Sequence, residues 1–435
     1  MGVLGMISWN GGWSDGLPPG SAFPVFAGVM MNRSKAGSGS LLAVFLLAGM
    51  LGGCSQTAVP GSSVSAVPTV TEQPGANLAE SLQVDVSGLK SGDGQPLLLY
   101  MEQKEIPERP TDPDKLPLEE ALHWYDLEYA GWNTEKTGMP ASPADGATGK
   151  QVMVIINGDH PYLTAYGIGA KKIADAYGMK LRIYSPNWDL NVQNQLLDQA
   201  INAKPDLIVL IPLDAKASVQ QLRKINEAGI PCIASNMVPY ADGFRYVIGW
   251  TGPDDWGQFR ILARELAKKL GNEGGICYLR HAPGGSPFFS RTYGMITELE
   301  KVAPHIVTLD MQAPGFEVEK TTQVVSDWIT KYGDQLKAIC IADDYTQLTG
   351  ALDACRKAGR EDIILVAAGN SRVGMDAVKA GKCFAITYQS AEADGAVPIK
   401  MAADWFNGLS VESVRYLPKH IIKQDNVDLF LPAQW

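Results

Sequence analysis

From residue 151 onward, short apolar runs alternate with longer segments whose apolar residues recur every third or fourth position. Continuous apolar runs are typical of strands buried in a parallel sheet, and the recurring pattern is typical of amphipathic helices. The first run, VMVII, is followed by a helical pattern that ends at Gly178. Ten such runs predict strands over residues 152–156, 181–184, 207–211, 231–235, 246–248, 276–280, 306–310, 338–342, 363–367 and 383–387.

The alternation of strands and helices restarts once, after Gly271. Strands that alternate with helices predict βαβ units and parallel sheets. The fold class is therefore α/β, with two Rossmann-like, doubly wound lobes of similar make. Two such sheets in tandem place the carboxyl ends of their strands at a shared cleft, which is where ligands bind in this architecture.

The N-terminal region contains a targeting signal. The 11 apolar residues Leu41–Leu51 follow Arg33 and Lys35 and precede Gly52, Gly53 and Cys54. Such a run is too short for a bilayer, which needs about 20 residues, and its flanks are those of a secretory signal peptide. The exit LGGC resembles the lipobox of bacterial lipoproteins, which predicts lipidation of Cys54. A plain signal peptide with an incidental cysteine is the alternative.

Four segments precede the regular alternation of strands and helices, and their composition indicates what each of them is. Residues 1–29 are Gly-rich and lack basic residues, so we expect a start codon called too early; residues 30–53 are the signal peptide. Residues 54–80, rich in Ser, Pro and Thr, predict a flexible tether. Residues 81–149 contain helix-breaking prolines and predict an irregular extension with one helix over 118–132. We expect the aromatic side of this helix to dock the extension on the main body, and a partner-binding patch is the alternative. If the extension is only a spacer between the folded part and the membrane anchor, it should be dispensable for binding.

Composition narrows the function. Apolar residues make up 46% of the chain and charged residues 19%, which excludes disorder of the bulk. The net charge of −10 gives no electrostatic footprint for nucleic acid. The five cysteines besides Cys54 cannot all pair, and most lie in predicted strands, which favours buried free thiols. Because no catalytic motif, dinucleotide fingerprint or metal cluster is evident, we expect a binding protein rather than an enzyme, with no cofactor and no metal.

Several segments of residues 151–431 together resemble the type I periplasmic binding proteins, which include sugar-binding lipoproteins of bacterial ABC transporters. The resemblance implies two lobes joined by a hinge of three crossings, and closure around a ligand. It places the N-terminal lobe at 151–252 plus 390–418 and the C-terminal lobe at 253–389 plus 419–435. The segments that carry it are DHPY (159–162), AKPDLIVLIPLDA (203–215), EAGIPCIASN (227–236), SRTYGM (290–295), AICIADD (338–344), TGAL (349–352) and AGKCFAITYQ (380–389).

The resemblance also implies site residues, by comparison with the ribose-binding branch. Gln389 matches the glutamine of the second crossing, whereas Met237, Phe289 and Gly369 depart from the pattern and indicate that the ligand is not simply ribose. Aromatic rings such as Trp188 would cover the C–H faces of a sugar. The candidate ligand-binding residues are Asp159, His160, Tyr162, Trp188, Asn236, Trp250, Phe289, Arg291, Phe316, Asp343, Asp344, Asn370 and Gln389. Asp344 is the strongest single candidate, because it follows a buried strand.

Hydroxyl groups both donate and accept, so polar side chains with fixed planar ends suit a sugar or polyol. We therefore expect a monomeric, extracytoplasmic solute-binding lipoprotein. It would be lipid-anchored to a bacterial membrane, in the periplasm or at the cell surface, and would deliver a sugar or polyol to an ABC transporter permease. The first alternative is a sensory receptor that presents a sugar-like signal to a kinase or chemoreceptor. The second is an enzyme whose cleft chemistry the sequence does not reveal.

Overall fold

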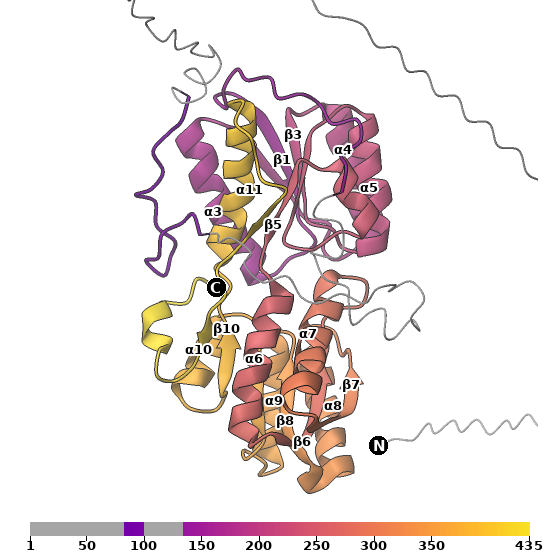
Figure 1. Cartoon of the computed structure of the whole chain (residues 1–435), viewed down its shortest axis with the longest axis vertical. Coiled ribbons are helices and arrows are strands. Elements are labelled where there is room, and N and C mark those ends of the chain that lie inside the picture. The colour runs from indigo at the N-terminus through magenta and orange to yellow at the C-terminus, as the bar shows by residue number, and fades with distance from the viewer. Residues whose placement is uncertain (1–81, 100–133) are drawn as a thin grey trace, which may run out of the picture. The chain divides into compact units, whose positions relative to one another are not determined.

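The computed structural model describes residues 82–99 and 134–435 (Figure 1). These residues belong to one compact unit. The predicted signal peptide, the lipidation site Cys54, the tether and the predicted helix over 118–132 lie outside the described residues. Within the described ranges, no helix has the length and apolar character needed to cross a membrane.

The first lobe is built on a six-stranded sheet with the order β11-β5-β4-β3-β1-β2, in which all neighbours are parallel. Helices α3 and α11 pack on one face of this sheet, and α4 and α5 pack on the other. Its inner strands are buried on both faces, which is why they read as continuous apolar runs. The elements are β1 (Gln151–Ile155), α3 (Pro161–Tyr177), β2 (Lys180–Tyr184), α4 (Leu190–Ala203), β3 (Leu207–Leu210), α5 (Ala215–Glu227), β4 (Cys232–Ser235), the 3₁₀ helix η2 (Ala241–Tyr246), β5 (Gly249–Gly252), α11 (Ala391–Phe406) and β11 (Val414–Tyr416).

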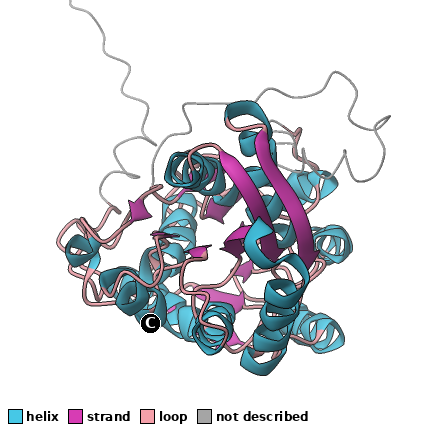
Figure 2. Ribbon diagram, turned by 90° about the horizontal axis from the view of Figure 1, so that it is seen from below, coloured by secondary structure: helices cyan, strands magenta, loops and turns pink. Residues whose placement is uncertain are grey.

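The second lobe repeats this plan with the strand order β12-β10-β9-β8-β6-β7. Only its β10–β12 pair is antiparallel. Figure 2 shows helices flanking the strands on both sides. The elements are α6 (Asp255–Leu270), β6 (Glu273–Leu279), α7 (Ser286–Val302), β7 (His305–Gln312), α8 (Val318–Tyr332), η3 (Gly333–Gln335), β8 (Leu336–Ile341), α9 (Thr346–Lys357), β9 (Ile364–Ala367), α10 (Arg372–Lys379), β10 (Ala385–Thr387), β12 (Ile421–Ile422) and η4 (Val427–Phe430).

The chain passes between the two sheets after β5, after β10 and after β11. The predicted α/β class, with two parallel-sheet lobes, is confirmed. The fifth strand was predicted over 246–248 but lies at Gly249–Gly252, because Tyr246 ends a 3₁₀ helix. Strands β11 and β12 were missed, since two or three residues carry no readable pattern. All five described cysteines are free and buried, as predicted.

Helices α3 and α11 touch through their backbones. A Cβ atom on Gly169 would lie 1.7 Å from the carbonyl oxygen of Glu392, and one on Gly395 would lie 1.8 Å from that of Tyr166. Real side chains never approach so closely, so only glycine fits at these two positions. The contact fixes α11, which follows the second crossing, to the first lobe.

The described part of the N-terminal extension packs on the main body and is not a detached spacer. Val86 and Leu97 lie in the hydrophobic core between the first sheet, α3 and α11. The backbone N–H of Gly92 donates to Glu392 Oε1 at 2.9 Å, and the hydroxyl of Tyr388 donates to Asp93 Oδ2 at 2.9 Å. These contacts tie the extension to the second crossing, which sequence composition did not indicate.

We expect Leu97→Ala to lower the free energy of unfolding by about 2–4 kcal/mol, because Leu97 is fully buried and truncation leaves a cavity. Urea unfolding of the folded chain measures this change. Val84→Ala, in the same segment but 38% exposed, is the matched control and should cost far less. Equal effects of the two substitutions would restore the spacer interpretation of this segment.

Candidate functional site

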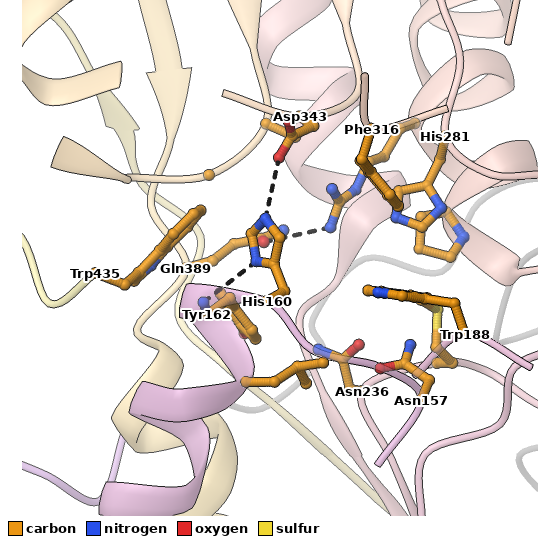
Figure 3. A pocket seen from close by; sticks show the side chains of 16 residues that line it. Asn157, His160, Tyr162, Trp188, Asn236, His281, Phe316, Asp343, Gln389 and Trp435 are labelled. Carbon is orange, nitrogen blue, oxygen red and sulfur yellow. Dashed lines mark hydrogen bonds and ion pairs between the residues drawn. The ribbon is translucent and has the colours of Figure 1, made fainter. Parts of the chain in front are cut away.

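A cavity lies where strands of both sheets reach their carboxyl ends (Figure 3). Asn157 follows β1 and Asn236 follows β4 in the first lobe, whereas Asp343 follows β8 and Gln389 follows β10 in the second. The centre of a water molecule can move through about 60 Å³ of this cavity. The lining residues are Asn157, His160, Tyr162, Leu163, Trp188, Asn236, Met237, His281, Pro287, Arg291, Phe316, Asp343, Ala368, Gly369, Gln389 and Trp435.

His160 caps the N-terminus of α3 and reaches toward the second lobe. Its Nδ1 accepts the backbone N–H of Tyr162 at 3.2 Å, so the neutral ring carries its proton on Nε2. Nε2 lies 3.8 Å from Asp343 Oδ1, which is too long for a hydrogen bond. Burial lowers the pKa of His160 and keeps the ring neutral near pH 7. The two lobes thus present a donor and an acceptor side by side.

Asp343 is held in place by its other carboxylate oxygen. Oδ2 accepts the backbone N–H and the hydroxyl of Thr346 at 2.7 and 2.8 Å, and the backbone N–H of Gln347 at 3.1 Å. These bonds satisfy the first backbone donors of α9. Oδ1 is thereby left facing His160 and the cavity.

A buried carboxyl group supports the first-lobe wall of the cavity. Asp394 Oδ2, at the start of α11, accepts from the hydroxyl of Tyr162 at 2.9 Å and from Nδ2 of Asn236 at 2.6 Å. Asn236 holds a left-handed backbone conformation with φ at 58°, which asparagine tolerates better than most residues. Burial raises the pKa of Asp394 to about 7, despite these two hydrogen bonds. Sequence reasoning missed Asp394, because it lies in the first turn of a helix and not in the loop that directly follows a strand.

Arg291 of α7 supports the second-lobe side and contacts the crossings. Its Nε donates to Asp255 Oδ1 at 3.0 Å, its second nitrogen to the carbonyl of Ala342 at 2.7 Å, and its third to Gln389 Oε1 at 3.3 Å. Gln389 Nε2 donates to the same Asp255 oxygen at 2.9 Å. Burial raises the pKa of Asp255, and the neighbouring guanidinium opposes that effect.

Aromatic rings form the side of the cavity opposite Trp435 (Figure 3). Trp188 and Phe316 lie with ring centroids 5.5 Å apart, and His281 meets Phe316 edge-on at 4.9 Å. Trp188 lies over Gly158, where any Cβ would be within 2.1 Å of the indole. Its own backbone is left-handed, with φ at 64°, a strained conformation for a bulky residue. Strain of this kind is frequent at binding sites.

Four polar atoms of lining residues are buried and lack a hydrogen-bond partner among the described residues: Asn157 Oδ1, His160 Nε2, His281 Nδ1 and Trp435 Nε1. An unsatisfied buried polar atom costs about 1–3 kcal/mol. Burial lowers the pKa of His281 to about 3, so this ring too stays neutral. Such a set of neutral donors and acceptors beside aromatic rings can bind a ligand rich in hydroxyl groups.

Eight of the predicted site residues line the cavity: His160, Tyr162, Trp188, Asn236, Arg291, Phe316, Asp343 and Gln389. Five do not: Asp159, Trp250, Phe289, Asp344 and Asn370. Exposed Asp159 accepts from the hydroxyl of Ser185, and Trp250 is fully buried in the first-lobe core. Phe289 packs against the second-lobe core, and Asn370 Oδ1 accepts the backbone N–H of Gln389.

The strongest single candidate, Asp344, is not among the residues that line the cavity. Its Oδ2 accepts the backbone N–H of Ser371, ahead of α10, at 2.7 Å. The carboxylate contacts Gly369 and Gly374, whose missing side chains make room for it. Burial raises the pKa of Asp344 well above its usual range. Of the two neighbouring aspartates, the structure places Asp343, and not Asp344, in the wall of the cavity.

Asn157, His281 and Trp435 were missed as site residues. Asn157 and His281 follow β1 and β6 directly, so the strand-end rule could have found them. Trp435 follows no strand, and no sequence signal marks it. Among the described residues, no group of three or more His, Cys, Asp or Glu side chains is arranged to hold a metal ion.

Comparison with known proteins gives consistent matches. A family model described as "Periplasmic binding protein domain" matches residues 152–410. A xylitol-binding protein of Mycolicibacterium smegmatis is 26% identical over 280 residues, covering 64% of this chain and 79% of that protein. A ribose import binding protein of Salmonella typhimurium is 25% identical over 268 residues, covering 60% of this chain and 86% of that protein.

Solved structures match the same region. A solute-binding protein of an ABC transporter from Bacillus halodurans, solved with bound myo-inositol, has a TM-score of 0.61 and 23% identity. The match covers 65% of this chain and 98% of that one. At this identity the likeness establishes the fold alone.

The raised pKa of Asp394 predicts a pH dependence of stability. Between about pH 4 and pH 7 the folded state retains a proton that the unfolded state has lost, so this group's contribution to stability falls as the pH rises through about 7. We expect the free energy of unfolding to fall more steeply from pH 5 to pH 8 in the parent than in Asp394→Asn. Urea titrations at several pH values measure the slopes. Asp175→Asn, on the exposed side of α3, is the control and should keep the slope of the parent. If the free energy of unfolding of Asp394→Asn fell as steeply with pH as that of the parent, Asp394 would not be the group responsible.

Proposed function

This chain belongs to the periplasmic binding protein family, and from that premise we propose that it is an extracytoplasmic receptor for a sugar or polyol. It would capture the solute between its lobes and deliver it to the permease of an ABC transporter. The resemblance drawn from the sequence is confirmed at the level of the family. Relatives named for xylitol, for ribose and for apiose support a polyhydroxylated ligand.

The observation that carries this proposal is a buried donor without a partner among the described residues, Nε2 of His160, which lies beside the carboxylate oxygen Oδ1 of Asp343 on the other lobe. A ligand hydroxyl can accept from Nε2 of His160 and donate to Oδ1 of Asp343, which satisfies both atoms at once. A carboxylate acceptor roughly doubles the strength of such a bond relative to a neutral one. Because one partner comes from each lobe, the same hydroxyl would also stabilise the closed arrangement.

The cavity suits a small solute. Its 60 Å³ is roughly four to six times the space that a single buried water needs by the same measure. Trp188 and Phe316 offer apolar faces for C–H groups, and Asn157 and Asn236 offer amides for hydroxyls. These dimensions support a monosaccharide or a polyol of similar size.

Asn236 and Gln389 would enter binding with their orientations already set. Asp394 orients Asn236, and Asp255 with Gln258 orients Gln389. Side chains held in place before binding lose less conformational freedom when the ligand arrives. The hinge would lie at the three crossings, next to Asp255 and Gln389, so closure and binding would share one hydrogen-bond network.

We expect a thermal-shift screen of the chain from residue 55 onward to find xylitol, D-ribose, D-allose or myo-inositol as a stabilising ligand. A solute at about 100 times its dissociation constant should add about 2.7 kcal/mol of stability. Failure of every monosaccharide and polyol in the screen would contradict the proposal. Turnover of the bound solute, followed by chromatography, would favour an enzyme instead.

Asp343→Asn should weaken binding of the screened solute about ten- to hundredfold, because the hydroxyl loses a charged acceptor. Asparagine is also a good helix cap, so its amide oxygen can keep the bonds to Thr346 and the fold should survive. Calorimetric titration measures the change. Asp353→Asn on α9, where the side chain is 40% exposed, is the control and should bind as the parent does.

Membrane attachment through Cys54 is part of this proposal, and the LGGC exit after an apolar run supports it. We expect Cys54→Ser to leave the protein folded but to abolish incorporation of labelled palmitate and partitioning with membranes. If the variant still incorporated palmitate and partitioned with membranes as the parent does, lipidation of Cys54 would be wrong and only the plain signal peptide would remain.

A further inference from the structure

The last five residues of the sequence, Leu431–Trp435, leave the second lobe and reach the cavity. Leu431 and Ala433 pack against the second-lobe core, whereas Trp435 packs against the first-lobe core. Trp435 is therefore the point at which this segment joins the wall of the cavity (Figure 3).

The indole of Trp435 contacts two residues that follow β1. Its ring centroid lies 5.4 Å from that of His160 and 5.4 Å from that of Tyr162, with the planes inclined at 62° and 83°. Edge-to-face arrangements of this kind are favourable. The indole Nε1–H is buried and has no hydrogen-bond partner within the described ranges. The ring is thus well packed, while its one polar atom remains unsatisfied.

Hydrogen bonds on both sides hold the segment in place. The backbone N–H of Arg372 donates to the carbonyl oxygen of Trp435 at 2.8 Å. The amide of Gln434 donates to Asp93 Oδ2 at 2.8 Å and to the hydroxyl of Ser390 at 2.9 Å, and it accepts the backbone N–H of Glu392 at 3.0 Å. The extension, the second crossing and α10 therefore fix the position of the indole together.

The residue that follows strand β9, beneath the indole, is a glycine, and it leaves room for the ring. Gly369, which follows β9, has φ at 111°, and a Cβ there would lie 3.3 Å from the indole and 2.4 Å from Asp344 Oδ1. A side chain at this strand end would compete with the indole for the same part of the cavity wall. Gly369 thus leaves that part of the wall to Trp435.

We infer that Trp435 is a ligand-contacting residue that sets which solutes the cavity accepts. Its ring would cover a C–H face of the solute and its Nε1–H would donate to a solute oxygen. This inference rests on the proposed function and adds a ligand-contacting residue to it.

The test compares the parent chain with Trp435→Ala and Trp435→Phe by calorimetric titration. The probes are xylitol, D-ribose and myo-inositol, each of which is a single unit. We expect the parent to bind at least one of these single units. Trp435→Ala should weaken that binding at least tenfold, and Trp435→Phe, which keeps a ring but loses the N–H, about fivefold.

Leu429→Ala is the matched control in the same C-terminal stretch, because Leu429 is 68% exposed and lies away from the cavity wall. It should bind as the parent does. Thermal unfolding without solute checks that each variant is folded. If Trp435→Ala is not folded, the test depends on Trp435→Phe alone. Unchanged or tighter binding of the single unit by a folded Trp435 variant overturns the inference and leaves the proposed function standing. No binding of any probe by the parent contradicts the proposed function itself.

Discussion

A guanidinium group removed from water must find acceptors, and those of Arg291 come from three separate parts of the chain. Asp255 begins the first helix after the first crossing, Ala342 ends a strand of the second lobe, and Gln389 lies at the second crossing. Removal of any one acceptor would leave a largely buried charge short of a partner, which is among the costliest defects a fold can carry. The relative placement of two crossings and one sheet edge therefore depends on this single side chain.

Hydrogen bonds from buried groups also hold the polar side chains around the rest of the cavity. Several polar side chains that face it are oriented by a group behind them: Tyr162 and Asn236 by Asp394, Asp343 by the first turn of α9, and Gln389 by Asn370 and Asp255. The supporting groups are themselves buried and come from helix starts and crossings. A site assembled in this way discriminates by geometry, because its donors and acceptors cannot rotate to suit a ligand of the wrong stereochemistry.

Strand periodicity predicted both sheets, since burial on two faces leaves continuous apolar runs that no other element produces. The rule that ligands meet carboxyl strand ends then found residues such as His160, Asn236 and Gln389. The rule could not choose between Asp343 and Asp344, because successive residues after a strand point to opposite sides and the turn decides which side faces the cleft. Trp250 was misassigned for a related reason: an aromatic residue in a short strand can face the core or the ligand. Trp435 and Asp394 escaped sequence reasoning because their roles arise from contacts between distant segments, which leave no local pattern.

The contact between α3 and α11 has a mechanical consequence. Since Gly169 and Gly395 bring the two backbones together without intervening side chains, α11 cannot slide or tilt against the first lobe. Bending at the second crossing is therefore confined to the few residues between β10 and α11, around Gln389 and Ser390. Because so few residues could bend, a small change in their backbone torsions would displace the far end of the opposite lobe by a large distance. The glycine contact thus holds α11 on the first lobe, so that any bending at the second crossing would occur beside the cavity.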